Sequence, residues 1–156
     1  MFKPVSIGVI GSGDCSPEIY QLAYEVGQGI ARAGARLICG GLGGVMEAAA
    51  KGAKEAGGLT IGILPGTSPD EANPYIDIPI VTDMGHARNI IVVRSSQAII
   101  AVSGSYGTLS EIALALKIGI AVVGLKTTYR DDQMLQASTA QEAVQMALAS
   151  ARARSF

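Results

Sequence analysis

The sequence predicts an α/β fold with a doubly wound, mainly parallel sheet of six or seven strands. Three observations predict it. Short apolar runs rich in β-branched residues alternate with longer amphipathic helical patterns along the chain. The short runs are apolar throughout, which is typical of strands that helices cover on both faces. Glycine-rich turns follow several of these runs directly, where a strand passes into a helix.

The expected elements follow one another in chain order. Residues 5–10 form the first strand, and Ser16 and Pro17 then start a helix as its N-cap and first residue, which stops at Gly34. Residues 67–79 are expected to form a polar loop. Such alternation gives right-handed βαβ units in a single Rossmann-like domain over residues 1–156. Further strands are expected at 36–39, 59–64, 98–102, 121–125 and 134–137, and another strand is expected to start at residues 80–81. Further helices are expected at about 44–56, 87–95, 107–118 and 139–152.

Composition excludes several classes of function. Of 156 residues, 49% are apolar and 16% charged, which is too apolar for a disordered chain. We expect no membrane partner, because no apolar run reaches the roughly 18 residues of a span, and residues 1–11 resemble a first strand more than a signal peptide. The net charge of −1 and the absence of Trp argue against nucleic acid. Cys15 and Cys39 have no metal-site spacing, so we expect reduced thiols, no protein-ligated metal and a cytoplasmic location.

Three glycine-rich turns, at residues 11–13, 40–44 and 104–107, are expected at one edge of the sheet, each between a strand and a helix. Glycine lets the backbone approach a ligand closely, and free N–H groups at a helix N-terminus favour an anion. Three turns on one edge therefore predict a site for a phosphorylated small molecule. The N–H groups of the 104–108 turn and the Thr108 hydroxyl are expected to hold the phosphate. The candidate binding residues are Gly11, Ser12, Gly13, Gly40, Gly41, Gly43, Gly44, Met46, Arg88, Asn89, Gly104, Ser105, Tyr106, Gly107 and Thr108.

Several common ligands are excluded by missing motifs. The chain has no Gly-x-x-x-x-Gly-Lys-Ser/Thr sequence, so it is not a P-loop NTPase. The first turn matches the dinucleotide fingerprint only in part, because Ser16 stands at the third glycine position. The second strand runs into Gly40 without the acidic residue that binds a ribose of NAD, so no NAD is expected. No lysine can be assigned to a Schiff base, so no pyridoxal phosphate is expected either.

Glu111 and Arg88 each allow a functional and a structural interpretation. Thr108 and Glu111 have the spacing of a helix capping box, as do Thr139 and Glu142, where no ligand is expected. Glu111, placed in the first turn of its helix, either caps that helix or faces the ligand. Arg88 suits bidentate contact with a phosphate, and its alternative is a surface ion pair. The helix should bury the apolar residues at helical spacing, namely Leu109, Ile112, Ala113 and Leu116.

The motifs together resemble a known superfamily. Gly40-Gly-Leu-Gly-Gly-Val-Met46, Ala87-Arg-Asn89, Gly104-Ser-Tyr-Gly-Thr-Leu-Ser-Glu111 and Ala113-Leu-Ala-Leu-Lys117 are similar to the Lonely-Guy-like proteins, often labelled "possible lysine decarboxylase". The short length and the stretches Ala72-Asn-Pro-Tyr75 and Met84-Gly-His-Ala-Arg-Asn89 look most like the molybdenum-cofactor carrier branch. That resemblance implies a binding or carrier protein for molybdenum cofactor, a metal that arrives with the ligand, cofactor-accepting enzymes as partners, and a homodimer or homotetramer.

A sister branch supplies the alternative function. Its members are phosphoribohydrolases, which release the base from nucleoside 5′-monophosphates of the cytokinin type. They typically have Pro-Gly-Gly where this chain has Ser103-Gly104-Ser105, and Arg-Lys where it has Arg88-Asn89. The Arg and Glu that the hydrolases use correspond to Arg88 and Glu111, which would be the catalytic pair. A nearby carboxylate can stabilise an oxocarbenium-like transition state. His86, the only histidine, cannot form a metal site alone.

Overall fold

The computed structural model describes residues 3–154, which form seven strands, five α-helices and two short 3₁₀ helices. The strands are β1 (Ser6–Gly11), β2 (Arg36–Cys39), β3 (Thr60–Leu64), β4 (Ile78–Val81), β5 (Ala98–Val102), β6 (Ala121–Leu125) and β7 (Leu135–Ala137). The helices are α1 (Pro17–Arg32), α2 (Val45–Glu55), α3 (Asn89–Arg94), α4 (Tyr106–Ile118) and α5 (Ala140–Ala153), with the 3₁₀ helices η1 (Pro69–Glu71) and η2 (Gly85–Arg88).

One seven-stranded sheet organises the molecule, in the order β4-β3-β2-β1-β5-β6-β7. Every neighbouring pair is parallel. The chain winds outward from β1 to β4, returns to β5 beside β1, and winds outward again to β7. The predicted doubly wound fold is therefore confirmed, and the sheet is parallel throughout. A crevice for ligands is expected beyond the carboxyl ends of β1 and β5, where the winding direction reverses.

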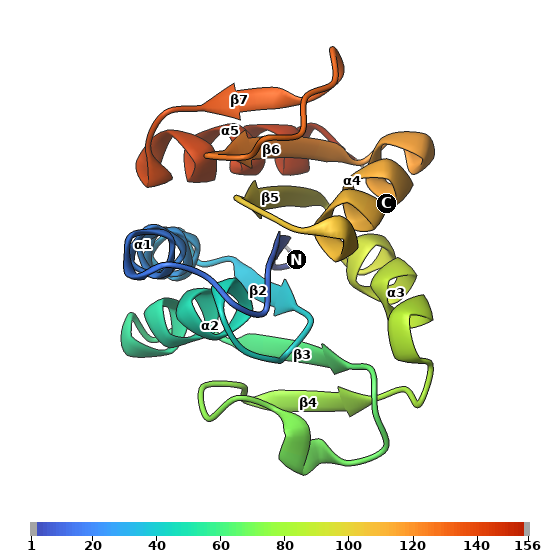
Figure 1. Cartoon of the computed structure of the whole chain (residues 1–156). Coiled ribbons are helices and arrows are strands. Elements are labelled where there is room, and N and C mark those ends of the chain that lie inside the picture. The colour runs from blue at the N-terminus through green and yellow to red at the C-terminus, as the bar shows by residue number, and fades with distance from the viewer. Residues whose placement is uncertain (1–2, 155–156) are drawn as a thin grey trace.

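Helices cover both faces of the sheet. Figure 1 shows α1 and α2 on one side of the sheet and α3 and α4 on the other. One core cluster joins β1 residues such as Ile7 to α1, α2 and α5, and a second joins Ile10 to α3 and α4. Helices α1 and α2 pack with their backbones close together, because a Cβ added at Gly27 would lie 1.9 Å from the Ala49 carbonyl oxygen. None of the helices in residues 3–154 is long and apolar enough to span a membrane.

The predicted helix starts at Ser16 and Thr139 are both present. The Ser16 hydroxyl accepts a hydrogen bond from the Ile19 N–H at 3.2 Å, and the Thr139 hydroxyl accepts one from the Glu142 N–H at 3.1 Å. Each satisfies an N–H group that has no partner inside its helix.

The region around the fourth strand differs from the prediction. Strand β4 ends at Val81 instead of starting at 80–81, and it includes Pro79. Proline is tolerated because β4 is an edge strand, where one N–H is not needed for the ladder. The helix expected at 87–95 begins as η2, and Arg88 stands at its junction with α3.

Helix α4 corrects two further predictions. It starts at Tyr106, so Glu111 lies in its second turn and not its first. The capping contact runs from the Ser105 N–H to the Thr108 hydroxyl at 3.2 Å, so the expected Thr108–Glu111 capping box is wrong. Leu109 and Ala113 are exposed and Leu116 is half-buried, so only Ile112 of the four expected core residues is fully buried. Tertiary packing turns inward the stripe of Thr108, Glu111, Ile112 and Ala115 instead.

Candidate functional site

A cavity of about 210 Å³ lies beside the crevice at the carboxyl edge of the sheet. Residues from all three glycine-bearing turns reach it, together with side chains of η2, α3 and α4. Its lining consists of Gly11, Gly13, Leu42, Met46, His86, Arg88, Asn89, Ser105, Gly107, Thr108 and Glu111. The topology therefore brings together residues that lie up to 100 positions apart in sequence.

The first two glycine turns pack directly on each other. The Val45 N–H donates to the Ser12 carbonyl at 3.0 Å, which joins the start of α2 to the turn after β1. A Cβ at Gly44, whose φ is +61°, would lie 2.2 Å from the same Ser12 oxygen. A Cβ at Gly11 would lie 2.6 Å from the Val45 side chain. Only glycine permits this approach, so these glycines also serve a packing function.

The third turn leads into α4, and residues at the start of this helix line the cavity. Gly104 has a φ of +142°, and a Cβ there would lie 2.9 Å from the Thr108 Cβ. The Ser105 N–H is held by the Thr108 hydroxyl, whereas no acceptor among residues 3–154 pairs with the N–H groups of Tyr106 and Gly107. Tyr106 is 86% exposed, so it contributes its backbone N–H to the turn and not its side chain. Free N–H groups at the start of a 13-residue helix are suited to an anion.

Arg88 is buried, with 8% of its surface exposed, and its guanidinium spans three elements. Nε donates to the Ile63 carbonyl at 2.9 Å and Nη2 to the Gly40 carbonyl at 3.3 Å. Nη1 donates to Asn89 Oδ1, and Asn89 Nδ2 donates in turn to the Ser110 hydroxyl at 3.2 Å. The side chain thus ties η2 to the ends of β2 and β3, while part of it still lines the cavity.

Glu111 is the most unusual ionisable group of the cavity. The residue is 8% exposed, and among residues 3–154 the charge that acts on its carboxyl group is that of Arg88. Burial raises its pKa to about 7, although the positive charge of Arg88 acts in the opposite direction. A carboxyl group with a pKa near neutrality can accept or donate a proton, and it can also bind a donor group of a ligand.

Cys39 lies behind the cavity as a packing residue. It is fully buried at the end of β2, and burial raises the pKa of its thiol to about 11. Such a thiol carries almost no thiolate at neutral pH, so it is unsuited to be a nucleophile. In the described part of the chain, no three His, Cys, Asp or Glu side chains are grouped in a way that could hold a metal ion.

The predicted site residues divide into two groups. Nine line the cavity: Gly11, Gly13, Met46, Arg88, Asn89, Ser105, Gly107, Thr108 and Glu111. The others lie in the adjoining turns without lining it: Ser12, Gly40, Gly41, Gly43, Gly44, Gly104 and Tyr106. Leu42 and His86 line the cavity although neither is among the predicted ligand contacts, and Leu42 could have been found as the centre of its glycine turn.

A larger groove lies elsewhere on the molecule. It has a volume of about 570 Å³ and lies between α1 and α5, against residues such as Arg32 and Gln145. It contains no turn between a strand and a helix and no buried ionisable group. The chemistry is concentrated in the smaller cavity, although the groove has more room.

Comparison with known proteins places the chain in a family. The model of the SLOG cluster4 family matches residues 4–154. The chain belongs to this family. A protein of Archaeoglobus fulgidus, described as uncharacterized, is 54% identical over 148 residues, which are 95% of this chain and 97% of that protein.

Two solved structures of similar proteins have the same architecture as this chain. The molybdenum cofactor binding protein of Rippkaea orientalis superposes with a TM-score of 0.89 at 39% identity, covering 96% of this chain and 98% of that one. The Moco carrier protein of Chlamydomonas reinhardtii gives a TM-score of 0.87 at 38% identity, covering 97% and 100%. The predicted resemblance to this superfamily and to its molybdenum-cofactor carriers is confirmed.

Phosphoribohydrolases also match, over less of their length. The cytokinin riboside 5′-monophosphate phosphoribohydrolase of Mycobacterium tuberculosis is 39% identical over 99 residues, which are 61% of this chain. The chain spans about half the length of the hydrolases that it matches, 52% in this case.

Proposed function

We propose that this protein binds molybdenum cofactor, or a similar phosphorylated small molecule, and passes it to cofactor-accepting enzymes in the cytoplasm. The observation that carries the proposal is the cavity between three glycine turns, in a chain similar over nearly its whole length to a molybdenum cofactor binding protein. The phosphoribohydrolases match over shorter stretches, which makes the binding function the first candidate.

In this proposal the phosphate of the ligand binds at the start of α4. The N–H groups of Tyr106 and Gly107 lack acceptors within residues 3–154, and the helix dipole adds attraction for an anion. The Thr108 hydroxyl accepts from the Ser105 N–H and keeps its own proton for the phosphate. Arg88 supplies positive charge nearby, and Asn89 supplies an amide held in place by Arg88 and Ser110.

The residues of the cavity fit a ligand that brings its own metal. Backbone N–H groups, hydroxyls and amides are donors for a phosphate and for the polar edge of a ring, whereas thiolates and imidazoles that would replace the metal's ligands are not gathered there. When bound, the cofactor would supply the redox chemistry of molybdenum to the enzyme that receives it. This chain's own residues bind and orient the cofactor.

Glu111 supports a second candidate function, that of a phosphoribohydrolase. Its buried carboxyl group, with a pKa of about 7, lies in the same cavity as Arg88, and both correspond to residues that the hydrolases use. In that reaction the bond between the base and the sugar breaks, water adds to the sugar, and the carboxylate stabilises the positive charge between these events.

We also propose a homodimer or homotetramer built through α4. Leu109 is 37% exposed and borders a depression between α4 and the loop after β6, which Ala113, Leu116, Tyr129 and Met134 line together with the charged Arg130 and Asp131. Leu109 and Ala113 follow the apolar spacing of a buried helix surface, yet both are exposed.

One pair of assays separates the two functions. Purified protein is incubated with AMP and with an isoprenoid-substituted AMP, and free base is measured by chromatography. In parallel, retention of molybdenum cofactor is measured under anaerobic conditions. Base release that disappears in Glu111→Ala would contradict the carrier function, whereas saturable cofactor retention without base release would contradict the hydrolase. Thr139→Ala is the control, because it removes a distant cap, costs about 1 kcal/mol of stability and leaves binding unchanged.

A further inference from the structure

Three consecutive carbonyl groups of the turn after β2 accept hydrogen bonds from residues of other segments. The Gly40 carbonyl accepts from Arg88 Nη2 at 3.3 Å. The Gly41 carbonyl accepts from the Asn73 N–H at 2.8 Å and from Asn73 Nδ2 at 3.3 Å, and Nδ2 also donates to the Leu42 carbonyl at 2.9 Å. Two side chains therefore fix the orientation of three successive peptide planes.

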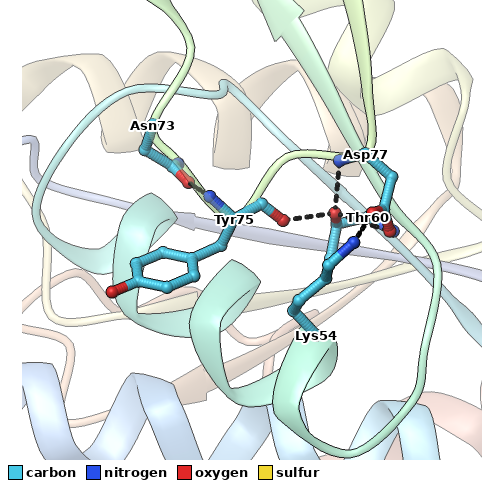
Figure 2. A network of polar contacts seen from close by, with 5 residues as sticks. All are labelled: Lys54, Thr60, Asn73, Tyr75 and Asp77. Carbon is cyan, nitrogen blue, oxygen red and sulfur yellow. Dashed lines mark hydrogen bonds and ion pairs between the residues drawn. The ribbon is translucent and has the colours of Figure 1, made fainter.

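Asn73 is itself held firmly in the loop before β4. Figure 2 shows Asn73 and Tyr75 joined to a polar network that reaches Thr60 at the start of β3. The Tyr75 N–H donates to Asn73 Oδ1 at 3.0 Å, and the Thr60 hydroxyl donates to the Tyr75 carbonyl at 2.6 Å. Asp77 accepts from the Thr60 N–H at 3.1 Å and pairs with Lys54 of α2. The segment 73–77 is therefore held in place by Thr60 and Lys54, and it fixes the position of the Asn73 amide beside the turn.

The direction of the N–H groups follows from the carbonyls. In a planar trans peptide, the carbonyl of one residue and the N–H of the next point in opposite directions. The N–H groups of Leu42 and Gly43 therefore point away from Asn73. Asn73 lies in the connection between β3 and β4, and β1 lies on the other side of β2. The N–H groups of Leu42 and Gly43, which point away from Asn73, are therefore directed towards the crevice over β1 and β5.

These two N–H groups are available to a ligand. Within residues 3–154, no carbonyl or side chain accepts a hydrogen bond from the N–H of Leu42 or Gly43. The Gly41 N–H differs, because it lies near the Cys39 thiol and lowers the pKa of that thiol, in opposition to the effect of burial. Leu42 lines the cavity, and Gly43 follows it in the same turn. Successive N–H groups that face one concave space bind anions and other acceptors.

We propose that the N–H groups of Leu42 and Gly43 donate hydrogen bonds to an acceptor of the ligand at a second subsite, and that Asn73 is the positioning residue that fixes their orientation. The acceptor is an oxygen, a ring carbonyl or an oxo group, at the end of the ligand remote from its phosphate. This inference rests on the proposed binding function, since it describes how the far end of the same ligand is held. Arg88 orients the first of the three peptide planes in the same way.

The experiment compares one ligand with its isolated phosphate. Molybdenum cofactor retention is measured anaerobically for the wild type and variants, and inorganic phosphate is titrated separately into ¹⁵N-labelled protein while the amide signals of Tyr106 and Gly107 are followed. In Asn73→Asp the Oδ1 acceptor for Tyr75 is kept, but the donor becomes a carboxylate that repels the two carbonyls. We expect cofactor affinity to fall about tenfold or more, as for two lost hydrogen bonds, with phosphate affinity within about twofold of the wild type.

Two further variants separate positioning from stability. Asp77→Asn breaks the Lys54 ion pair at the far end of the network without touching the turn, so it should lower stability but keep cofactor affinity within about twofold of the wild type. Asn73→Ser, which retains one donor, should recover part of the affinity lost in Asn73→Asp. An Asn73→Asp protein that retains cofactor like the wild type would overturn the inference and leave the proposed function intact, as would equal loss of cofactor affinity in Asp77→Asn. A wild-type protein that binds neither cofactor nor phosphate would overturn the proposed function itself.

Discussion

Replacing Glu111 by Gln should stabilise the protein at alkaline pH and leave it nearly unchanged at acid pH. Glutamine has the shape of a protonated glutamic acid and cannot ionise. The pKa of Glu111 is raised from its ordinary value of 4.5 to about 7 by burial. A carboxyl group with a raised pKa in the folded state stabilises the fold while it is protonated, and this contribution is lost as the pH rises through about 7.

The magnitude follows from the two pKa values. With about 1.4 kcal/mol for each pKa unit, the interval from 4.5 to about 7 corresponds to about 3.5 kcal/mol at most. The wild type should therefore lose about 2–3 kcal/mol of unfolding free energy from this one group between pH 5 and pH 8.5. Glu111→Gln should avoid that loss, so the advantage of the variant should grow by the same amount over this interval.

Urea unfolding of both proteins at pH 5 and pH 8.5 measures the effect. Glu25→Gln is the matched control, because it makes the same chemical change on the exposed surface of α1, where the difference from the wild type should be equal at both pH values. A free-energy difference for Glu111→Gln that does not change with pH would refute the reasoning, since it would mean that the carboxylate is well solvated or paired in the folded protein.

Three other substitutions test the turns, the packing and the exposed helix face. Gly104→Ala places a Cβ 2.9 Å from the Thr108 Cβ at a φ of +142°, so phosphate titration should show at least tenfold weaker binding, whereas Gly107→Ala, with nothing nearer than 4.0 Å, should fold normally. Gly27→Ala brings a Cβ to 1.9 Å from a carbonyl oxygen of α2 and should cost about 3 kcal/mol in urea unfolding; an unchanged midpoint would contradict the close helix contact. Leu109→Glu should reduce the molar mass measured by light scattering to that of the monomer, and an unchanged mass would exclude α4 from the interface.

The strands and helices could be predicted because their signals are local. Short, mainly apolar runs predicted the strands at 36–39, 98–102 and 121–125 with the observed bounds. The side chains of Ser16 and Thr139 cap the helices that they were expected to start. The three glycine turns could be predicted at one edge for the same reason. Parallel strands connected by helices place their carboxyl ends together.

The orientation of α4 could not be predicted from its sequence. Apolar spacing favoured burial of Leu109 and Ala113, but the fold buries the stripe that contains Thr108 and Glu111. Propensity and periodicity describe one helix alone, whereas which stripe faces inward depends on the elements that pack against it. The contacts of Asn73 with the 40–44 turn also lay beyond prediction, because 31 and 32 residues separate the partners and no local pattern records the pairing.

The most direct measurement is anaerobic titration of the purified protein with molybdenum cofactor, followed by filtration and determination of the molybdenum retained. We expect saturable retention that approaches one cofactor per chain, is weakened by Gly104→Ala and Asn73→Asp, and is preserved in Thr139→Ala. No retention by the wild type, together with release of free base from AMP that disappears in Glu111→Ala, would contradict the binding function and establish the hydrolase instead.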